Sequence, residues 1–293
     1  EYRLATDIDQ LDSNTTALDL RNRELSALPD AVCRHKQLKV LLLSNNQLSS
    51  LPDCIAALTN LHILYLDNNR LINLPTPFGQ LDALQTLTLQ RNNLTRLPDG
   101  FAQLKNLREL DLGFNQMAQL PDGFGRLSNL ATFDGTYNSL TQLPAGLGAL
   151  KNLESLMLYN NQLGSLPDDF GQLIRLKSLN LSNNQISTLP GSFGQLTNLE
   201  SFSMLSNQLT SLPENFGQLK KIHWLELSGN QLTELPESFG QLSGLTDLNL
   251  SRNKLSTFPA AFGQLARLQT FAGSNNQLTS LPPGFGQLPR LQN

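Results

Sequence analysis

The chain has 293 residues, and 21 Lys and Arg residues against 24 Asp and Glu residues give it a formal net charge of -3. Without a basic excess to neutralise phosphates, this composition does not favour a general nucleic-acid-binding protein. The longest purely aliphatic run, Val40 to Leu43, is far shorter than the ~20 residues that a membrane span requires.

The N-terminal segment, residues 1–14, precedes the regular part of the sequence. It mixes the apolar residues Ile8 and Leu11 with three aspartates, as one amphipathic turn would. The first regular unit also departs from the later ones, with Arg23 and His35 at positions that are elsewhere Asn and Leu. A terminal repeat has no neighbour on one side, so polar residues there are typical of a cap. We expect residues 1–14 to form an N-terminal cap.

Residues 15–290 consist of twelve consecutive units of 23 residues, without insertion or deletion. Their shared pattern is L-x-x-L-x-L-x-x-N-x-L-x-x-L-P-x-x-F-G-Q-L-x-x. No single unit of this size can bury its leucines, whereas stacked neighbours make one continuous core. The asparagine of the pattern recurs at Asn46, Asn69, Asn92, Asn115, Asn138, Asn161, Asn184, Asn207, Asn230, Asn253 and Asn276.

Each part of the 23-residue unit predicts a local structure. The L-x-L alternation indicates a strand with one buried face. The asparagine amide both donates and accepts, so stacked asparagines can satisfy backbone groups that would otherwise be unpaired. Proline ends the extended segment because it has no N–H to donate. We expect the F-G-Q-L stretch to form a compact outer turn, either helical or 3₁₀.

The C-terminal residues 291–293 begin a thirteenth unit and then stop. An uncapped last strand leaves unpaired backbone groups and an open core. We therefore expect this to be a truncated repeat and the chain to be part of a longer protein.

Over essentially its whole length the pattern resembles the leucine-rich repeat family, in the 23-residue cytoplasmic type. That type occurs in Ras-suppressor and Scribble-like proteins, in plant intracellular Ras-group proteins, and in bacterial proteins that include secreted effectors. The resemblance implies an α/β fold, a right-handed horseshoe-shaped solenoid. In it a parallel β-sheet lines the concave face, and short helical or 3₁₀ turns form the convex face. It also implies a protein-binding role, usually on the concave face.

The sequence contains no recognisable catalytic or metal-binding motif. His62 and His223 occupy the same repeat position seven units apart, about 34 Å at ~4.8 Å per strand, so they cannot share a proton or a metal ion. Phosphate-binding, zinc-protease and nucleophile-elbow motifs are absent. We expect no catalysis and no cofactor or metal within these residues.

The two cysteines, Cys33 and Cys54, lie at the outer turns of adjacent units, where they could approach each other. Thiols of cytosolic proteins are kept reduced, and the four-cysteine cap of extracellular leucine-rich repeat proteins is missing. We expect two free thiols and a cytoplasmic location, which would be a host cytoplasm if the protein is a bacterial effector.

Candidate binding residues occupy repeat positions whose side chains point outward by strand alternation. Of the 14 Phe residues, only Phe114 falls outside a core position of the pattern. Exposed aromatic side chains are typical of interface hot spots, and their clustering in adjacent units favours a binding patch over neutral drift. The candidates are Tyr65; a central cluster of Glu109, Asp111, Phe114, Asp134, Tyr137, Met157 and Tyr159; and a second cluster of Leu205, His223, Trp224 and Glu226.

One outer position is glutamine in most units, from Gln80 to Gln287. Such uniformity fits a structural role, with hydrogen bonds between stacked turns, and carries little specificity. We therefore do not expect a partner to bind there.

Three functions remain open. The first is a non-catalytic module that docks a protein with a basic, partly apolar segment on the concave face. The second is the recognition arm of a larger enzyme or bacterial effector whose catalytic domain lies outside this chain. The third is a structural solenoid that associates through its C-terminal edge, although we expect a monomer. Small-ligand or carbohydrate binding on the concave face is disfavoured, because the sequence implies no pocket there.

Overall fold

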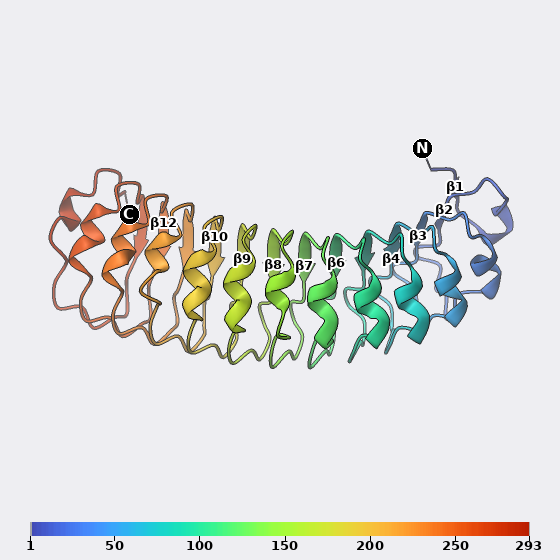
Figure 1. The fold of residues 1–293 in the computed structure, drawn as a ribbon, viewed down its shortest axis with the longest axis horizontal. Helices are drawn as coiled ribbons and strands as arrows, with labels where there is room; N and C mark the ends of the chain where they lie inside the picture. Colours follow the sequence, from blue (N-terminus) through green and yellow to red (C-terminus); the bar gives the residue numbers. More distant parts are fainter. Residues whose placement is uncertain (1, 293) are drawn as a thin grey trace. The chain divides into compact units, whose positions relative to one another are not determined.

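The computed structural model describes residues 2–292 and divides into two compact units, Glu1–Leu140 and Thr141–Asn293. We call them the N-terminal unit and the C-terminal unit. Each repeats the same arrangement of a short strand, a tight turn, an extended segment and a short 3₁₀ helix (Figure 1).

The N-terminal unit contains seven parallel strands in sequence order. From β2 onward each residue pairs with the residue 23 positions later, as Leu18 does with Leu41. The strands are β1 (Leu4–Ala5), β2 (Ala17–Asp19), β3 (Val40–Leu42), β4 (Ile63–Tyr65), β5 (Thr86–Thr88), β6 (Glu109–Asp111) and β7 (Thr132–Asp134). The 3₁₀ helices are η1 (Ile8–Gln10), η2 (Asp30–Arg34), η3 (Asp53–Ala57), η4 (Thr76–Gln80), η5 (Asp99–Gln103) and η6 (Asp122–Arg126).

The C-terminal unit contains six parallel strands with the same 23-residue register, as in the pairing of Leu156 with Leu179. The strands are β8 (Ser155–Met157), β9 (Ser178–Asn180), β10 (Ser201–Ser203), β11 (Trp224–Glu226), β12 (Asp247–Asn249) and β13 (Thr270–Ala272). The 3₁₀ helices are η7 (Leu147–Ala149), η8 (Asp168–Gln172), η9 (Gly191–Gln195), η10 (Phe216–Gln218), η11 (Glu237–Gln241), η12 (Ala260–Gln264) and η13 (Phe285–Gln287).

The strand and turn predictions are confirmed. In β4 the central Leu64 is fully buried, whereas Ile63 and Tyr65 on either side are partly exposed. Pro190 precedes η9 in an extended conformation, and the buried Phe193 anchors that helix to the core. Burying each such side chain stabilises the fold by roughly 1.5–3 kcal/mol relative to leaving it in water.

The phenylalanines of successive 3₁₀ helices lie parallel to one another. In the C-terminal unit the ring centroids of Phe193 and Phe216 are 6.1 Å apart with planes only 2° from parallel, and Phe216 and Phe239 repeat this geometry. The parallel sheet and the 3₁₀ helices thus share one leucine and phenylalanine core.

The asparagine ladder also forms as expected. Asn184 donates from Nδ2 to the carbonyl oxygens of Leu158 and Leu181, 3.0 Å each. Its Oδ1 accepts a hydrogen bond of 2.9 Å from the N–H of Leu163. Each buried asparagine therefore connects two neighbouring repeats and pairs backbone groups that the strands leave unbonded.

The expectation that glutamines join the outer turns is wrong for most of the column. Within residues 2–292, Gln172 is the member with a side-chain hydrogen bond to another repeat, accepted from Lys151 Nζ at 3.1 Å. Asparagines at a different outer position make these bonds, because a shorter amide reaches the carbonyl oxygen 24 residues earlier without losing as many rotamers. They are Asn60, Asn106, Asn129 and Asn198.

The expectation of two free thiols is also wrong, because Cys33 and Cys54 form a disulfide. Cys33 lies on η2 and Cys54 on η3, and stacking of these helices brings the two Cα atoms to 5.7 Å. That separation is within the range that a disulfide spans. The bond joins the outer sides of two neighbouring repeats.

Both ends of the chain continue the repeat arrangement. Strand β1 pairs with β2, and Asp7 caps the start of η1, where its side chain accepts a hydrogen bond from the N–H of Asp9. At the other end, the N–H of Gln292 donates to the carbonyl oxygen of Gln269. The roles of residues 1–14 as a cap and of residues 291–293 as a truncated repeat stay predictions. Among the described residues, no helix is long and apolar enough to cross a membrane.

Candidate protein-binding face

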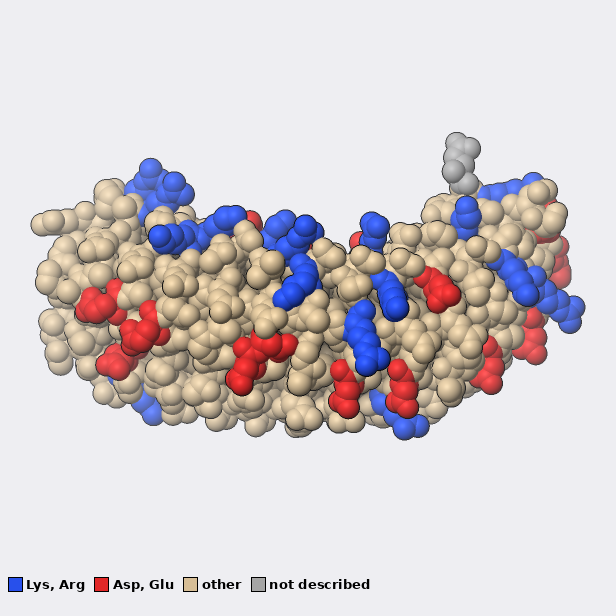
Figure 2. Space-filling view, viewed as in Figure 1, with Lys and Arg blue, Asp and Glu red and all other residues tan. Residues whose placement is uncertain are grey.

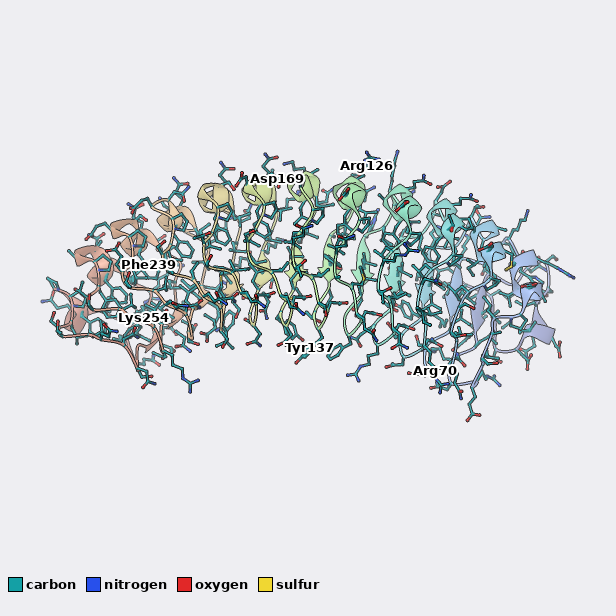
Figure 3. The ribbon with its side chains drawn as sticks, turned by 90° about the horizontal axis from the view of Figure 1, so that it is seen from below. Arg70, Arg126, Tyr137, Asp169, Phe239 and Lys254 are labelled. Carbon is teal, nitrogen blue, oxygen red and sulfur yellow. A yellow bond between two sulfur atoms is a disulfide. The ribbon has the colours of Figure 1, made fainter. Side chains whose placement is uncertain are left out.

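The surface of the sheet that faces away from the 3₁₀ helices carries the candidate binding residues. In Figure 3, within the N-terminal unit, Arg126 lies on the helix side and Tyr137 on the opposite side. None of the candidates is buried, and three of them are notably accessible, with Tyr137 44%, Trp224 41% and Leu205 36% exposed. We call this surface the sheet face.

An aromatic pair is the most distinct feature of the sheet face in the N-terminal unit. The rings of Phe114 and Tyr137 are stacked, with centroids 4.2 Å apart and planes 12° from parallel. The Arg91 guanidinium carbon lies 4.8 Å from the Phe114 ring centroid, within the range of a cation–π contact. Three successive repeats therefore supply one stack of planar groups.

The backbone at this pair has an unusual conformation for aromatic residues. Phe114 has a φ of 55° and Tyr137 a φ of 51°, both in the left-handed region. Nearly every repeat has a left-handed residue here, and asparagine, which tolerates the conformation well, predominates. A bulky aromatic residue costs of order 1 kcal/mol or more at such a site. Two adjacent repeats thus carry aromatic side chains where the local backbone favours asparagine.

Carboxylates surround the aromatic pair. Asp111 on β6 and Asp134 on β7 are register partners in adjacent strands. Asp111 Oδ1 accepts from the N–H of Gly113 at 2.8 Å, and Asp134 Oδ1 accepts from the N–H of Thr136 at 2.9 Å. Asp67, two strands before Asp111, accepts instead from the next repeat: its Oδ1 accepts from the N–H of Gln90 at 3.0 Å and its Oδ2 from Thr88 Oγ1. One oxygen of Asp111 and one of Asp134 remain available on the sheet face.

The environment of Asp111 favours its protonated form. Burial is the main cause that raises the pKa of this carboxyl to about 6, with a contribution from the charges of Asp134 and Asp67 and against the opposing effect of the hydrogen bond from Gly113. Of the ion pairs within residues 2–292, none involves these three aspartates. The nearest cation described at this site, Arg91, contacts the Phe114 ring and forms no ion pair with these carboxylates.

Gly113 is buried beside the two carboxylates. A Cβ at this position would lie 3.1 Å from Asp111 Oδ1, 3.2 Å from Thr136 Oγ1 and 3.6 Å from Asp134 Oδ1. The first two distances are shorter than ordinary van der Waals contact, so glycine fits here without displacing a neighbour. The missing side chain lets these polar groups lie close together beside the aromatic pair.

The other two candidates in the N-terminal unit, Glu109 and Tyr65, lie outside the aromatic pair. Glu109 Oε2 accepts a long hydrogen bond of 3.4 Å from Thr86 Oγ1. Tyr65 lies at the end of β4, where its register partners are Leu42 and Thr88. Both side chains border the carboxylate group without joining the aromatic pair.

The candidates in the C-terminal unit lie on its own sheet face. Met157 ends β8, and Tyr159 follows two residues later; their membership of the central cluster stays a prediction. Trp224 begins β11 next to the exposed His223, and Glu226 ends that strand. Glu226 accepts from the Ser228 N–H at 2.8 Å and from Asn249 Nδ2 at 2.9 Å.

Sequence reasoning missed two members of the N-terminal site, Asp67 and Arg91. Both stand in outward-facing repeat positions, and Arg91 precedes Phe114 by one 23-residue unit. A comparison of the residues at this repeat position in adjacent units would have identified Arg91. Within residues 2–292, no group of three or more metal-ligating side chains comes together.

Comparisons with known proteins agree with this geometry. A family model described as leucine rich repeat matches residues 13–71, 75–117, 128–186, 151–209, 174–232 and 233–278. No curated protein sequence matches the chain.

Solved structures match over nearly the whole chain. A leucine-rich repeat protein of Leptospira interrogans is 38% identical, with 96% of this chain and 77% of that chain covered and a TM-score of 0.79. An internalin of Listeria monocytogenes, 22% identical, has a TM-score of 0.81 with 96% and 80% covered, which shows the fold alone. The Toll–Spätzle complex of Drosophila contains a chain that is 28% identical, with 90% and 37% covered and a TM-score of 0.77.

Proposed function

The chain belongs to the leucine-rich repeat family, and we propose that it is a non-catalytic module that binds a protein partner on its sheet face. The main contact region is the aromatic–acidic patch of the N-terminal unit, which we define as Asp67, Asp111, Phe114, Asp134 and Tyr137. The observation that carries the proposal is the stacked aromatic pair in left-handed backbone, bordered by carboxylates without a basic partner.

The aromatic pair is costly for the isolated protein, which favours a role in binding. Phe114 and Tyr137 occupy positions where asparagine would fit the backbone better, and a strained residue that serves no purpose in packing suggests a functional one. Large aromatic side chains contribute strongly to interfaces because they bury much area with few rotatable bonds.

The charge around the pair specifies the partner. Asp111, Asp134 and Asp67 form no ion pair within the described part of the chain, so a lysine or arginine would remove their mutual repulsion on binding. Apolar groups next to that cation would cover the Tyr137 ring. The partner segment that fits is therefore basic and partly apolar, and the charges also speed its encounter with the patch.

The sheet face of the C-terminal unit offers a second contact region. Trp224, Leu205 and Glu226 are accessible there, and Met157 and Tyr159 lie on β8 and just beyond it. We propose that these residues extend the interface with the same protein.

The relatives favour protein recognition over catalysis. The Drosophila Toll structure that resembles this chain is a complex with the protein Spätzle. The alternative function, the recognition arm of a larger enzyme or bacterial effector, uses the same patch and differs only in what is joined to the chain. In both proposals this chain binds the protein partner and is not itself the catalyst.

The experiment that tests this function is affinity capture followed by mass spectrometry, with Phe114→Asn/Tyr137→Asn compared with the parent. Asparagine suits the left-handed backbone, so this variant should fold with unchanged or slightly higher stability while the patch is lost. We expect at least a tenfold loss of the captured partner.

A matched control is Ile72→Asn/Ile174→Asn, which removes two exposed apolar side chains elsewhere. It should capture the partner as the parent does. Equal capture by the patch variant and the parent would show that the aromatic pair plays no part in binding.

A further inference from the structure

The C-terminal unit has a strongly basic edge, where each 3₁₀ helix turns into the following strand. Seven of the nine Lys and Arg residues between positions 141 and 293 lie in these turns, and all seven are exposed. The same turns hold two carboxylates, Glu154 and Glu200. We define the basic edge as Lys151, Arg175, Lys177, Lys220, Lys221, Arg267 and Arg290.

The opposite edge of the same unit is acidic. Asp168 and Asp169 begin η8, Glu237 begins η11, and Glu214 precedes η10. In Figure 2, the part of the molecule formed by this unit shows Lys and Arg along its upper edge and Asp and Glu in its lower half. A small net charge for the whole chain therefore conceals two edges of opposite sign.

The cations of the basic edge are mostly left uncompensated. Lys177 pairs with Glu154 at 2.8 Å. Lys221 and Arg175 donate instead to the neutral amide oxygens of Asn198 and Asn152, at 2.6 and 2.9 Å. Such neutral contacts hold the side chains in place and leave their charge free to attract an anion.

Three further cations have no side-chain partner at all among the residues described. They are Lys220, Arg267 and Arg290, which are exposed on the turns before β11, before β13 and at the end of the unit. The basic edge therefore offers a charged ligand two kinds of cation, those held in place by neighbouring amides and those without a side-chain partner.

The repeat arranges these charges in a row. Neighbouring strands lie about 4.8 Å apart, so the six repeat steps from Lys151 to Arg290 cover roughly 29 Å. The row is one or two side chains wide, because each turn supplies only its two or three exposed positions. Its shape fits a long, thin anion better than a compact one.

We propose that the basic edge binds a linear sulfated polysaccharide. Sulfate groups spaced along the polymer would pair with the row of cations, and Asn152 and Asn198 hold two of these cations, Arg175 and Lys221, in place. Clustered Lys and Arg on one surface are a known footprint of heparin-like ligands. This site is separate from the sheet face and does not depend on the proposed protein partner.

Two other anionic partners fit the edge less well. Single-stranded nucleic acids stack their bases on aromatic side chains, and the turns of the basic edge contain no Phe, Tyr or Trp. A membrane surface would require apolar side chains for insertion, and Ile174, 52% exposed, is the one large aliphatic residue exposed in those turns within residues 141–292.

The test measures the affinity of a size-defined heparin decasaccharide by titration calorimetry at 50 and 150 mM salt. The variant Arg175→Gln/Lys220→Gln/Lys221→Gln/Arg267→Gln removes four cations from exposed turns. We expect its affinity to fall at least tenfold and the slope of log K against log salt to become shallower, because fewer counterions are released.

The matched control Arg70→Gln/Arg96→Gln/Arg252→Asn/Lys254→Gln removes the same charge from sites off the basic edge. In Figure 3, Lys254 lies away from the helix side of its unit, where Asp169 is seen. Circular dichroism checks that both variants are folded. The control should bind heparin within about twofold of the parent.

Three results would overturn the proposal. The first is no heparin binding at 50 mM salt, and the second is an equal loss in the matched control. The third is binding of desulfated heparin, duplex DNA or phosphatidylserine vesicles at least as tightly as heparin, which would assign the edge to another ligand or to unspecific attraction.

Discussion

At the scale of single residues, the 23-residue pattern fixes the backbone conformation of each repeat, while the residue type at a few positions differs from the pattern. Gly229 occupies the same left-handed position as Phe114 and Tyr137, with a φ of 68°, and shows what the backbone accepts without strain. Aromatic side chains at this point lie beyond the end of the strand, and Tyr137 is exposed there although its ring stacks on Phe114. The residue type, and not the backbone, makes this part of the sheet face a candidate site.

Asp111 provides a pH-dependent prediction. Its folded pKa of about 6 lies above the unfolded value of 3.8, so the folded state binds more protons between these values. Stability should therefore fall as pH rises from about 4 to about 6. Asp111→Asn should remove this loss and, because solvent screens part of the effect, stabilise the protein by about 1 kcal/mol at pH 8.

Urea unfolding at pH 3.5 and pH 8 measures the effect. Asparagine keeps an oxygen that can accept from the Gly113 N–H, so the turn should persist. The exposed Asp99→Asn serves as the control and should change stability little at either pH. If Asp111→Asn is no more stable than the parent at pH 8, the ionised Asp111 carboxylate does not destabilise the folded protein.

At the scale of elements, two asparagine columns have different roles. Asn184 lies in the core and bonds three backbone groups of two repeats. Asn198 lies on the outer turn and donates to the single carbonyl oxygen of Ile174 at 2.7 Å. Burial decides their importance, because an unpaired backbone group costs much more where water cannot reach it.

This difference predicts unequal effects of the same substitution. Asn184→Ala leaves the buried N–H of Leu163 without a partner. It also removes one of the two side-chain hydrogen bonds that the carbonyl oxygens of Leu158 and Leu181 each accept, and should cost about 3 kcal/mol in total. Asn198→Ala leaves groups that water can bind, and should cost below about 1 kcal/mol. Chemical denaturation compares the two variants with the parent, and similar losses would show that the inner column is not the main support.

At the scale of the whole molecule, the two proposed binding surfaces and the crosslink belong to different parts of the fold. The aromatic–acidic patch belongs to the N-terminal unit and the basic edge to the C-terminal unit. The disulfide of Cys33 and Cys54 joins two N-terminal repeats. Because disulfides persist in oxidising compartments and are rare in the cytosol, the crosslink disagrees with the cytoplasmic location expected from the sequence.

The disulfide yields a prediction for the stability of the chain. The two cysteines are 21 residues apart, and closing a loop of this size stabilises a fold by about 3 kcal/mol, chiefly by restricting the unfolded chain. Cys33→Ser/Cys54→Ser should lose about that amount in guanidinium unfolding, and the parent in reductant should behave in the same way. Two titratable thiols in the untreated folded parent would refute the crosslink.

Much of the fold could be predicted from the sequence because its information is periodic. Leu64 and its equivalents repeat every 23 residues, so burial of one implies burial of all, and the inner asparagine ladder follows from the same spacing. Asn60 and its outer equivalents do not recur in every unit, so the spacing does not predict that ladder and points to the more regular glutamine position instead. Phe114 and Tyr137 follow β6 and β7 in left-handed backbone, so their outward direction depends on the turn and does not follow from alternation along the strand.

Spacing along the chain is enough to predict the repeat, the parallel strands, the leucine core and the outward-facing positions within the strands. The tertiary structure alone decided the stacking of Phe114 on Tyr137, the burial of Asp111 beside Asp134, the pairing of Cys33 with Cys54 and the separation of charge between two edges. These features depend on distances between side chains of neighbouring repeats, and such distances exist only after the repeats have stacked.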